Sequence, residues 1–335
     1  MRSLIGDELR MDEPMSRHTT LRVGGPARWF WAASDVEALS RVLVACADNG
    51  ISYLVLGHGS NVLMSDAGYD GLIVQNRCKR IVVGEETYCE SGASLGALSH
   101  RASLAGYAGL EWGIGIPGTV GGALVSNAGA YRGNIGPLVR EIRLVHSGVD
   151  RHVGADWMEF EYRNSRLRRA GVSKTVILSC TLALARESDS DSILARAKKY
   201  QALRREKQPL APSAGSFFKN VLNHSLAQSL DSLAPAMKDA GVVPAGYLVD
   251  ACGLKGARCG GAFVSDKHAN FLINPGRDAS ARDFRNLAAM VKTAVHDRFG
   301  VMLEEEVLYV GDWTGDMSDG PAQPRTPADS STHKT

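Results

Sequence analysis

The segment from Gly113 to Tyr131 constrains the fold of this chain more than any other, because it contains few bulky side chains. It runs Gly-Ile-Gly-Ile-Pro-Gly-Thr-Val-Gly-Gly-Ala over residues 113–123 and Ser-Asn-Ala-Gly-Ala-Tyr over residues 126–131. Glycine lets a ligand touch the backbone directly. The segment therefore predicts a cradle for a phosphate group or a cofactor.

The first three glycines of this segment match the G-x-G-x-x-G dinucleotide pattern, but Pro117 argues against a Rossmann turn. In that turn the last glycines open a helix whose free N–H groups face a pyrophosphate. Proline has no N–H group, and it keeps Ile116 out of the helical region. We therefore expect the helix to begin at about Thr119, with Thr119 as its N-cap, and the nucleotide to be held in another way.

Composition and charge narrow the class of protein. The chain has 335 residues, 44% hydrophobic and 22% charged, which is ordinary for a soluble globular protein of two or three domains. A net charge of +2 gives no field that suggests nucleic acid. No apolar run reaches the roughly eighteen residues of a membrane span. The cysteines form no C-x-x-C pair and no secretory leader precedes them, so we expect reduced thiols in a cytoplasmic protein and no metal site.

Helices and strands are expected to alternate along the chain. Ser34 to Glu37 has the pattern of a capping box, followed by a helix toward Gly50 and a strand over Tyr53–Leu56. Further predicted helices cover 94–105, the residues after Thr119, 192–207, 245–252 and 279–299, and further predicted strands cover 138–145, 175–184, 270–273 and 301–310. Pro209 ends a helix and indicates a domain boundary.

The loop Gly57–Asn61 follows the predicted strand 53–56 directly. Loops at the carboxyl ends of strands are where α/β sheets bind ligands, and this one offers two glycines with hydroxyl and amide groups. A plain turn is the alternative interpretation.

Six motifs occur together in an order that resembles the bacterial UDP-N-acetylenolpyruvoylglucosamine reductase family. They lie at residues 17–25, 57–61, 116–131, 160–165 (FEYRNS), 213–220 (SAGSFFKN) and 303–307 (LEEEV). The resemblance covers about residues 15–311. Residues 253–256, 260–262 and 267–271, and the short interval between Tyr162 and Ser216, resemble the type II form.

The resemblance implies an α+β, three-domain FAD-binding fold of the vanillyl-alcohol-oxidase/PCMH type with a C-terminal substrate domain. The expected parts are FAD-binding subdomains at 1–75 and 76–209, a substrate-binding domain at 210–311 and a disordered tail at 312–335. It also implies that NADPH reduces bound FAD, which then reduces UDP-N-acetylglucosamine enolpyruvate to UDP-N-acetylmuramate for peptidoglycan synthesis. A UDP-sugar and NADPH are the expected partners, and a monomer is expected.

Three residues carry the catalysis that the resemblance implies. Hydride addition to the enolpyruvyl double bond places negative charge beside a carboxylate, so it needs a fixed cation and a proton source. Arg163 is similar to the family's cation, Ser216 to its proton donor, and Glu306 to a third acidic member. From the residues alone, Arg163 and Glu306 could be solvated surface groups and Ser216 a cap or turn residue.

Binding residues follow from the same resemblance. The motifs similar to the family's cofactor loops contribute Gly57, Gly59, Ser60, Asn61, Gly118, Gly122 and Asn127, and those similar to its UDP-sugar contacts contribute Tyr162, Lys207, Asn220 and His268. Arg132 replaces the usual glycine after Ala-Tyr, and Leu308 replaces the arginine that often follows Glu-Val.

Two other functions remain open from the sequence. The same fold could oxidise an alcohol or a sugar with oxygen, although no His or Cys flavin-attachment signature is present. A flavin-binding protein without turnover would have no need of Arg163, Ser216 and Glu306.

Overall fold

The computed structural model describes residues 1–170, 175–187 and 189–314, and its contacts divide the chain into two compact units. Unit 1 takes residues 1–18, 25–60 and 68–207, and unit 2 takes residues 19–24, 61–67 and those from 208 onward. Two short segments from the first fifth of the chain are therefore built into the C-terminal unit.

The first sheet of unit 1 has the strand order β1-β2-β5-β3. Its strands are β1 (Arg10–Pro14), β2 (Pro26–Ala33), β5 (Tyr69–Asn76) and β3 (Tyr53–Leu56), of which β1 is antiparallel to β2 and the others run parallel. The helix α2 (Val36–Asp48) lies in the chain between β2 and β3. The parallel pairing puts the loop after β3 at the carboxyl edge of the sheet, as expected for a ligand-binding loop.

The N-cap of α2 differs from the expected capping box. The side chain of Asp35 accepts a hydrogen bond from the backbone N–H of Ala38, so Asp35 is the cap and Glu37 stands too early to complete a box. Asp caps a helix as well as Ser does. The helix consequently begins one residue later than the sequence pattern predicts.

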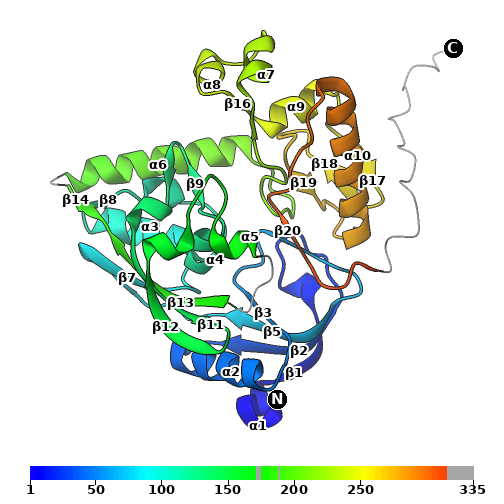
Figure 1. Ribbon diagram of the computed structural model, residues 1–335. Helices are drawn as coiled ribbons and strands as arrows, with labels where there is room; N and C mark the ends of the chain where they lie inside the picture. Colours follow the sequence, from blue (N-terminus) through cyan, green and yellow to red (C-terminus); the bar gives the residue numbers. More distant parts are fainter. Residues whose placement is uncertain (171–174, 188, 315–335) are drawn as a thin grey trace. The chain divides into compact units, whose positions relative to one another are not determined.

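The second sheet of unit 1 is antiparallel, with the order β12-β11-β13-β7-β6. Its strands are β12 (Val149–Gly154), β11 (Val139–His146), β13 (Thr175–Ala183), β7 (Glu86–Glu90) and β6 (Ile81–Val82). The helices α3 (Leu95–Leu104), α4 (Val120–Val125) and α6 (Ser190–Lys207) lie on one side of this sheet and α2 lies on the other (Figure 1). The predicted strands at 138–145 and 175–184 are confirmed.

Each side of the second sheet has its own hydrophobic core. Leu98 of α3 and Leu124 of α4 pack with Ile142 and Leu182 on one side. On the other side α2 packs against strands of both sheets, with Leu39 and Leu43 among the fully buried residues. Burying a side chain of this size stabilises the fold by roughly 1.5–3 kcal/mol. These two cores hold the loops at the strand ends in place.

Short elements complete unit 1. They are α1 (Arg2–Ile5), α5 (Arg166–Arg169), the pair β8 (Tyr107–Ala108) and β14 (Ala185–Arg186), the pair β9 (Gly129–Ala130) and β10 (Gly133–Asn134), and the 3₁₀ turns η1 (Gly6–Glu8), η2 (Met15–Arg17), η3 (Glu111–Gly113), η4 (Gly136–Leu138) and η5 (Ala155–Met158).

Unit 2 consists of small sheets and helices around one core. Its pairings are β17 (Arg258–Cys259) with β18 (Ala262–Val264) and β19 (Leu272–Ile273), β15 (Val221–Leu222) with β16 (Val242–Val243), and β20 (Leu308–Val310) parallel to β4 (Val62–Met64). Its helices are α7 (His224–Ser229), α8 (Pro235–Asp239), α9 (Ala245–Ala251) and α10 (Ala281–Phe299). The early segments supply Leu21, Val23 and Leu63 to this core.

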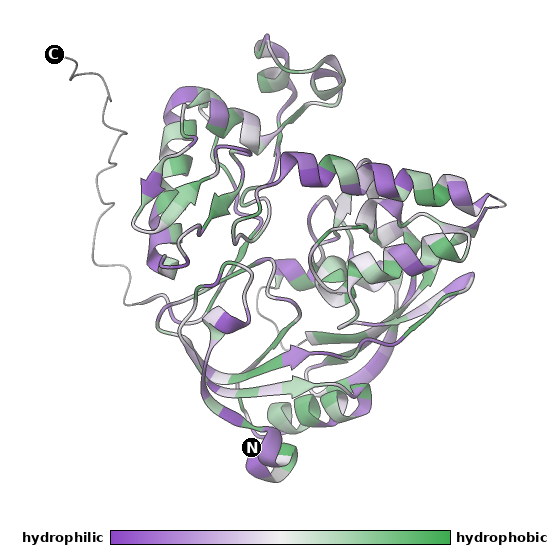
Figure 2. Cartoon of the chain, turned by 180° about the vertical axis from the view of Figure 1, so that it is seen from behind, coloured by the Kyte–Doolittle hydropathy of each residue, from purple (hydrophilic) through white to green (hydrophobic). Residues whose placement is uncertain are grey.

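The long helix α10 fits its predicted stripe of apolar residues. Phe284, Leu287 and Val291 are fully buried. Figure 2 shows hydrophobic and hydrophilic residues mixed along the helix. Ser280 and Asp283 form a capping box, and the carboxylate of Asp66 accepts bonds from the first two N–H groups of the helix, 2.8 and 3.0 Å long. A residue more than 200 positions away in the chain thus fixes the start of α10.

The prediction of one strand over residues 301–310 is wrong. The structure has a strand only at β20, and Glu305 forms an isolated bridge with Phe218. Leu303 and Val307 are buried as the alternation predicts. The segment contacts two partners in succession, first residues 217–219 and then β4, so no single ladder forms. The predicted tail at 312–335 falls mostly on residues 315–335, outside the described part of the chain.

Candidate active site

The two glycine-rich loops that were predicted to bind a cofactor lie against each other in unit 1. Ser60 Oγ donates a hydrogen bond to the carbonyl of Pro117 at 3.0 Å. A Cβ atom on Gly57 would lie 2.8 Å from Thr119 Cγ2, closer than real Cβ contacts. Glycine is therefore required at position 57, because the loop after β3 packs tightly on the residue that caps α4.

The first turn of α4 is not an open anion site. The N–H of Val120 bonds to Ala93 O at 2.8 Å, that of Gly121 to Ser91 O at 2.8 Å, and that of Gly122 to Thr119 Oγ1 at 3.3 Å. These N–H groups are the ones that a Rossmann helix would offer to a pyrophosphate. The structure thus confirms Thr119 as the N-cap and agrees with the rejection of a Rossmann turn.

The exposed backbone beside α4 fits a bound cofactor. Gly122 is exposed, and a Cβ atom there would meet only Thr119 Oγ1 at 3.6 Å, so packing within the protein does not require glycine. Gly118 has φ of 138°, and a Cβ atom on it would approach Ser60 Oγ to 3.1 Å. Bare backbone on adjoining loops is the surface that an extended cofactor such as FAD needs for close approach.

Asn127 has an internal role in the structure. Its side chain is buried, donates to Glu161 O at 2.7 Å and accepts from Gly136 N at 3.0 Å. Its backbone is left-handed, with φ of 42°. The amide of Asn127 therefore joins the glycine-rich segment to the motif that contains Arg163, and its predicted contact with FAD stays a prediction.

Arg163 occupies a strained turn. Glu161 and Asn164 exchange backbone hydrogen bonds of 3.1 and 3.2 Å across it, and Arg163 has φ of 50°. This left-handed conformation favours glycine and costs a residue with a side chain roughly 1–2 kcal/mol. Ser165, fully buried, anchors the turn by donating to Val125 O at 2.6 Å. Backbone strain that its surroundings hold in place is a property of functional sites.

The guanidinium of Arg163 points back to the glycine-rich segment. Its Nη2 donates to the carbonyl of Gly129, and its Cζ lies 5.5 Å from the centre of the Tyr162 ring. The Tyr162 side chain is exposed. Unit 1 therefore brings Tyr162, Arg163 and Asn127 together around one stretch of backbone.

Ser216 and Glu306 are neighbours in the backbone of unit 2. Ser216 follows Gly215, whose φ of 77° requires glycine-like freedom. The next residue, Phe217, donates its N–H to Asn270 O at 2.7 Å and accepts from Glu306 N at 2.8 Å. Both predicted catalytic residues of this unit therefore stand on adjoining chain segments, each fixed by the fully buried Phe217.

Asn61 is hydrogen-bonded to the segment that contains Glu306. Its Nδ2 donates to Glu306 O at 3.1 Å, and its carbonyl accepts from Leu308 N at 3.0 Å. The sequence predicts Asn61 as a cofactor contact. The structure adds that Asn61 belongs to unit 2 and positions the backbone of Glu306.

The remaining predicted substrate contacts lie in both units. In unit 2, Asn220 Oδ1 accepts from Ala245 N at 3.2 Å at the start of α9, and His268 Nδ1 accepts from Asn270 N at 3.2 Å. His268 Nδ1 therefore acts as an acceptor, which ties the imidazole ring to the backbone two residues further on. In unit 1, Lys207 is exposed at the last position of α6.

Sequence reasoning missed Arg204. This arginine of α6 is only 8% exposed, and its guanidinium donates to Ile114 O at 2.5 Å and to Trp112 O at 3.2 Å. It thereby holds the start of the glycine-rich segment. In the sequence it stands among Arg205 and Lys207 at a helix end, a pattern typical of solvated charge, so only tertiary structure reveals its burial.

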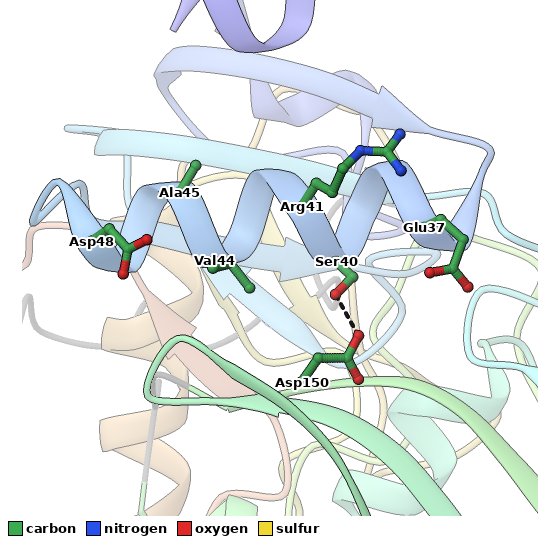
Figure 3. A pocket seen from close by; sticks show the side chains of 7 residues that line it. All are labelled: Glu37, Ser40, Arg41, Val44, Ala45, Asp48 and Asp150. Atoms are coloured by element: carbon green, nitrogen blue, oxygen red, sulfur yellow. Dashed lines mark hydrogen bonds between the residues drawn. The ribbon is translucent and has the colours of Figure 1, made fainter.

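A shallow pocket on unit 1 lies elsewhere. It runs along α2 and is lined by Glu37, Ser40, Arg41, Val44, Ala45, Asp48 and Asp150 (Figure 3). None of the predicted site residues is among them.

Within the described part of the chain, no group of three or more His, Cys, Asp or Glu residues is placed to hold a metal ion. Nor does any described helix have both the length and the apolar character that a membrane crossing requires.

Comparisons with known proteins find relatives of one family. Residues 207–310 match the family model for the C-terminal domain of UDP-N-acetylenolpyruvoylglucosamine reductase, and residues 27–147 match a model for an FAD binding domain. The reductase of Caldicellulosiruptor bescii is 38% identical over 313 residues, covering 92% of each chain. That of Geobacter metallireducens is 37% identical over 316 residues, covering 93% of this chain and 97% of its own.

A solved structure gives the same result. The crystal structure of UDP-N-acetylenolpyruvylglucosamine reductase from Thermus caldophilus is 30% identical, covers 90% of this chain and 98% of its own, and superimposes with a TM-score of 0.70. The expected α+β FAD-binding fold is confirmed by this match and by the FAD binding domain.

Proposed function

The chain belongs to the UDP-N-acetylenolpyruvoylglucosamine reductase family, and from this premise we propose that it makes UDP-N-acetylmuramate. It is an FAD-dependent oxidoreductase that uses NADPH to reduce UDP-N-acetylglucosamine enolpyruvate, a step in peptidoglycan precursor synthesis. Bound FAD, held by the residues of the two glycine-rich loops, would supply the hydride chemistry that links NADPH to the enolpyruvyl double bond. The protein's own residues supply binding, charge and a proton.

The observation that carries the catalytic assignment is the strained turn at Arg163. A guanidinium binds a carboxylate through two hydrogen bonds and stays charged at every working pH. Hydride addition gives the enolpyruvyl group enolate character, so a fixed cation at its carboxylate stabilises the transition state more than the ground state. The fold holds Arg163 at a backbone angle that arginine disfavours, with Ser165 and Asn127 supporting the turn.

Ser216 is proposed as the proton donor and Glu306 as the acid beside it. A serine hydroxyl can protonate a strongly basic carbanion, and the glycine before Ser216 leaves room for a ligand. The bond from Glu306 N to Phe217 O keeps the two residues on adjoining segments. We propose that Glu306 supports the proton transfer and that Tyr162, Lys207, Asn220 and His268 bind the UDP-sugar.

We propose that Gly57, Gly59, Ser60, Asn61, Gly118, Gly122 and Asn127 contact FAD. The close packing of the two loops and the exposed backbone at Gly122 support this assignment. The three-part division at residues 75, 209 and 311, the type II assignment, the monomer and the cytoplasmic location also stay proposals.

Burial raises the pKa of the Cys180 thiol to about 12, which is consistent with an unreactive thiol.

An anaerobic two-step titration tests the function. The purified protein should be yellow, lose its colour with NADPH, and regain it when the enolpyruvyl sugar nucleotide is added. Ser216→Ala should leave the first step nearly intact and slow the second by about 10² to 10⁴-fold, because a positioned acid is lost.

Ser213→Ala is the matched control, since Ser213 lies in the same segment and forms a backbone bridge with Ile273. It should leave both steps close to wild type. Equal slowing of both steps by Ser216→Ala would remove Ser216 from the proton-donor role. An oxidase would instead regain colour with oxygen and show no response to the sugar nucleotide, and a flavin carrier without turnover would be insensitive to Arg163, Ser216 and Glu306.

A further inference from the structure

A tight hairpin in the glycine-rich segment carries unusual strain. Ala130 of β9 pairs with Gly133 of β10, so Tyr131 and Arg132 form a two-residue loop. Their φ angles are 51° and 68°, and a type I′ turn requires positive φ at both positions, which Asn-Gly normally provides. Here two residues with large side chains adopt it, at a cost of roughly 1–2 kcal/mol each.

Contacts from α6 hold this hairpin in place. The Tyr131 ring stacks on the Tyr200 ring, with centroids 4.3 Å apart and planes 8° from parallel. The buried guanidinium of Arg204 lies 5.4 Å from the centre of the Tyr131 ring and also bonds to Trp112 O at 3.2 Å. Tyr200 and Arg204 are four residues apart, so both project from the same face of α6.

The second strand of the hairpin packs on Trp112. A Cβ atom on Gly133 would lie 2.8 Å from Trp112 Nε1, so the hairpin rests directly on the Trp112 ring. The hairpin therefore contacts Tyr200, Arg204 and Trp112, and Arg204 is bonded to the backbone carbonyl of Trp112.

The hairpin in turn supplies the acceptor for Arg163. Gly129, the first residue of β9, accepts the hydrogen bond from Arg163 Nη2 through its carbonyl. From these contacts we propose that Tyr200 and Arg204 are positioning residues, which act through the Tyr131 hairpin to orient the Arg163 guanidinium toward the substrate carboxylate. The proposal rests on the proposed function, since it assigns Arg163 the carboxylate of the enolpyruvyl group.

The test compares both half-reactions and FAD content in the purified holoenzyme. Tyr200→Ala removes the stack and should slow reoxidation by the enolpyruvyl sugar nucleotide, or raise its KM, by about tenfold. Bleaching by NADPH and FAD content should stay within about threefold of wild type. Tyr200→Phe keeps the stacked ring and should restore the second half-reaction, which a role of the hydroxyl would not predict.

A double-mutant cycle shows whether the effect passes through Arg163. If it does, Tyr200→Ala should add little to the slowing already caused by Arg163→Lys, whereas independent effects would multiply. Arg204→Lys keeps the positive charge but loses the planar guanidinium that bonds to two carbonyls. It should slow the second half-reaction as Tyr200→Ala does, and its effect should likewise not add to that of Arg163→Lys.

Three outcomes would overturn the proposal: multiplicative effects in the cycle, equal slowing of both half-reactions, or no slowing at all in Tyr200→Ala. If Tyr200→Ala lowers FAD content or unfolds, the proposal is tested by the second half-reaction of Tyr200→Phe and by the double-mutant cycle of Arg204→Lys with Arg163→Lys. Failure of the proposed function is distinguishable, because wild-type protein would then not be reoxidised by the sugar nucleotide at all.

Discussion

At the scale of single residues, Arg163 and Gly122 show opposite relations between backbone and side chain. Arg163 has a side chain at a position where the backbone favours glycine, with φ of 50°. Gly122 is a glycine at a helical position where packing permits a side chain. Packing within the protein does not explain why arginine stands at position 163 or glycine at position 122. We therefore propose that each residue contacts a ligand.

Arg163→Gly should separate stability from activity. Removing the side chain relieves the left-handed strain, which offsets the lost bond to Gly129 O, so the free energy of unfolding should stay within about 1 kcal/mol of wild type. The second half-reaction should be strongly slowed. Urea unfolding monitored by fluorescence, with reoxidation kinetics, checks both.

The matched control is Arg163→Ala, which also lacks the guanidinium but keeps a Cβ atom. It should be less stable than Arg163→Gly by roughly 1 kcal/mol. Equal stability of the two variants would show that the turn is not strained.

Gly122→Ala should keep or slightly raise the stability of the protein without FAD, by up to about 1 kcal/mol, because alanine favours the helix. Its affinity for FAD should fall, since the methyl group stands on the exposed backbone. Calorimetric titration of FAD into the stripped protein, with thermal unfolding, measures both.

Gly57→Ala is the comparison, because its Cβ atom would clash with Thr119 Cγ2. It should lower stability and FAD affinity together. Unchanged FAD affinity in Gly122→Ala would place the cofactor away from α4.

At the scale of elements, α2 is joined to β11 and β12 by a charge network that includes Glu37, Ser40 and Asp150, three residues of the pocket in Figure 3. Arg143 of β11 bonds to Glu37 at 2.6 Å and to Asp150 at 2.8 Å, and Ser40 Oγ donates to Asp150 at 2.6 Å. The hydrogen bond from Arg143, aided by Ser40, lowers the pKa of Asp150.

Asp150→Asn should lower the free energy of unfolding by about 1 kcal/mol at neutral pH. A carboxyl whose pKa is lowered in the folded state stabilises it above its unfolded pKa of about 3.9, and the contribution is lost as pH falls below that value. The difference between variant and wild type should therefore stay constant from pH 6 to about pH 5 and shrink as pH falls further toward pH 3 in urea unfolding.

Asp70→Asn, in the exposed pair with Arg28, is the control and should change stability by less than about 0.5 kcal/mol. A difference for Asp150→Asn that is independent of pH would show that packing, and not its charge, matters.

Elements governed by neighbouring residues were predictable from the sequence. Pro117 and Thr119 fix the start of α4 through local sterics and capping, and the apolar stripe of α10 follows from helical spacing. The structure of the segment 301–310 could not be predicted from the sequence. Its two halves contact different partners, and the alternation of apolar and polar residues does not reveal this.

The site was predictable only in part, for the same physical reason. Motifs single out Arg163 and Ser216 as candidates, and their roles stay predictions. The burial of Arg204 depends on a carbonyl 90 residues away, which no motif reveals. The bonds of Asn61 and Asn127 to backbone atoms likewise arise from tertiary structure. Whether these side chains also contact FAD stays a prediction.

At the scale of the whole molecule, the C-terminal unit is assembled from three separate stretches of chain. Leu63 of β4 is fully buried in its core together with Leu287 of α10. A substitution near the N-terminus should therefore loosen the C-terminal unit.

Leu63→Ala should destabilise by about 2–5 kcal/mol through the cavity it leaves. Hydrogen exchange measured by mass spectrometry should then show faster exchange in α10 and β20. Leu98→Ala, in the core beneath α3, is the counterpart and should speed exchange in β13 instead. Faster exchange in β13 and unchanged α10 for Leu63→Ala would contradict the division into units.

Residues 19–24 and 61–67 leave the ribosome long before their partners do. At about 5–20 residues per second, the interval between the synthesis of β4 and that of α10 is roughly 10 to 40 seconds. During this time Leu21, Val23 and Leu63 have no core to enter. These apolar side chains therefore stay exposed to water on the nascent chain until the last helix of the C-terminal unit has been made.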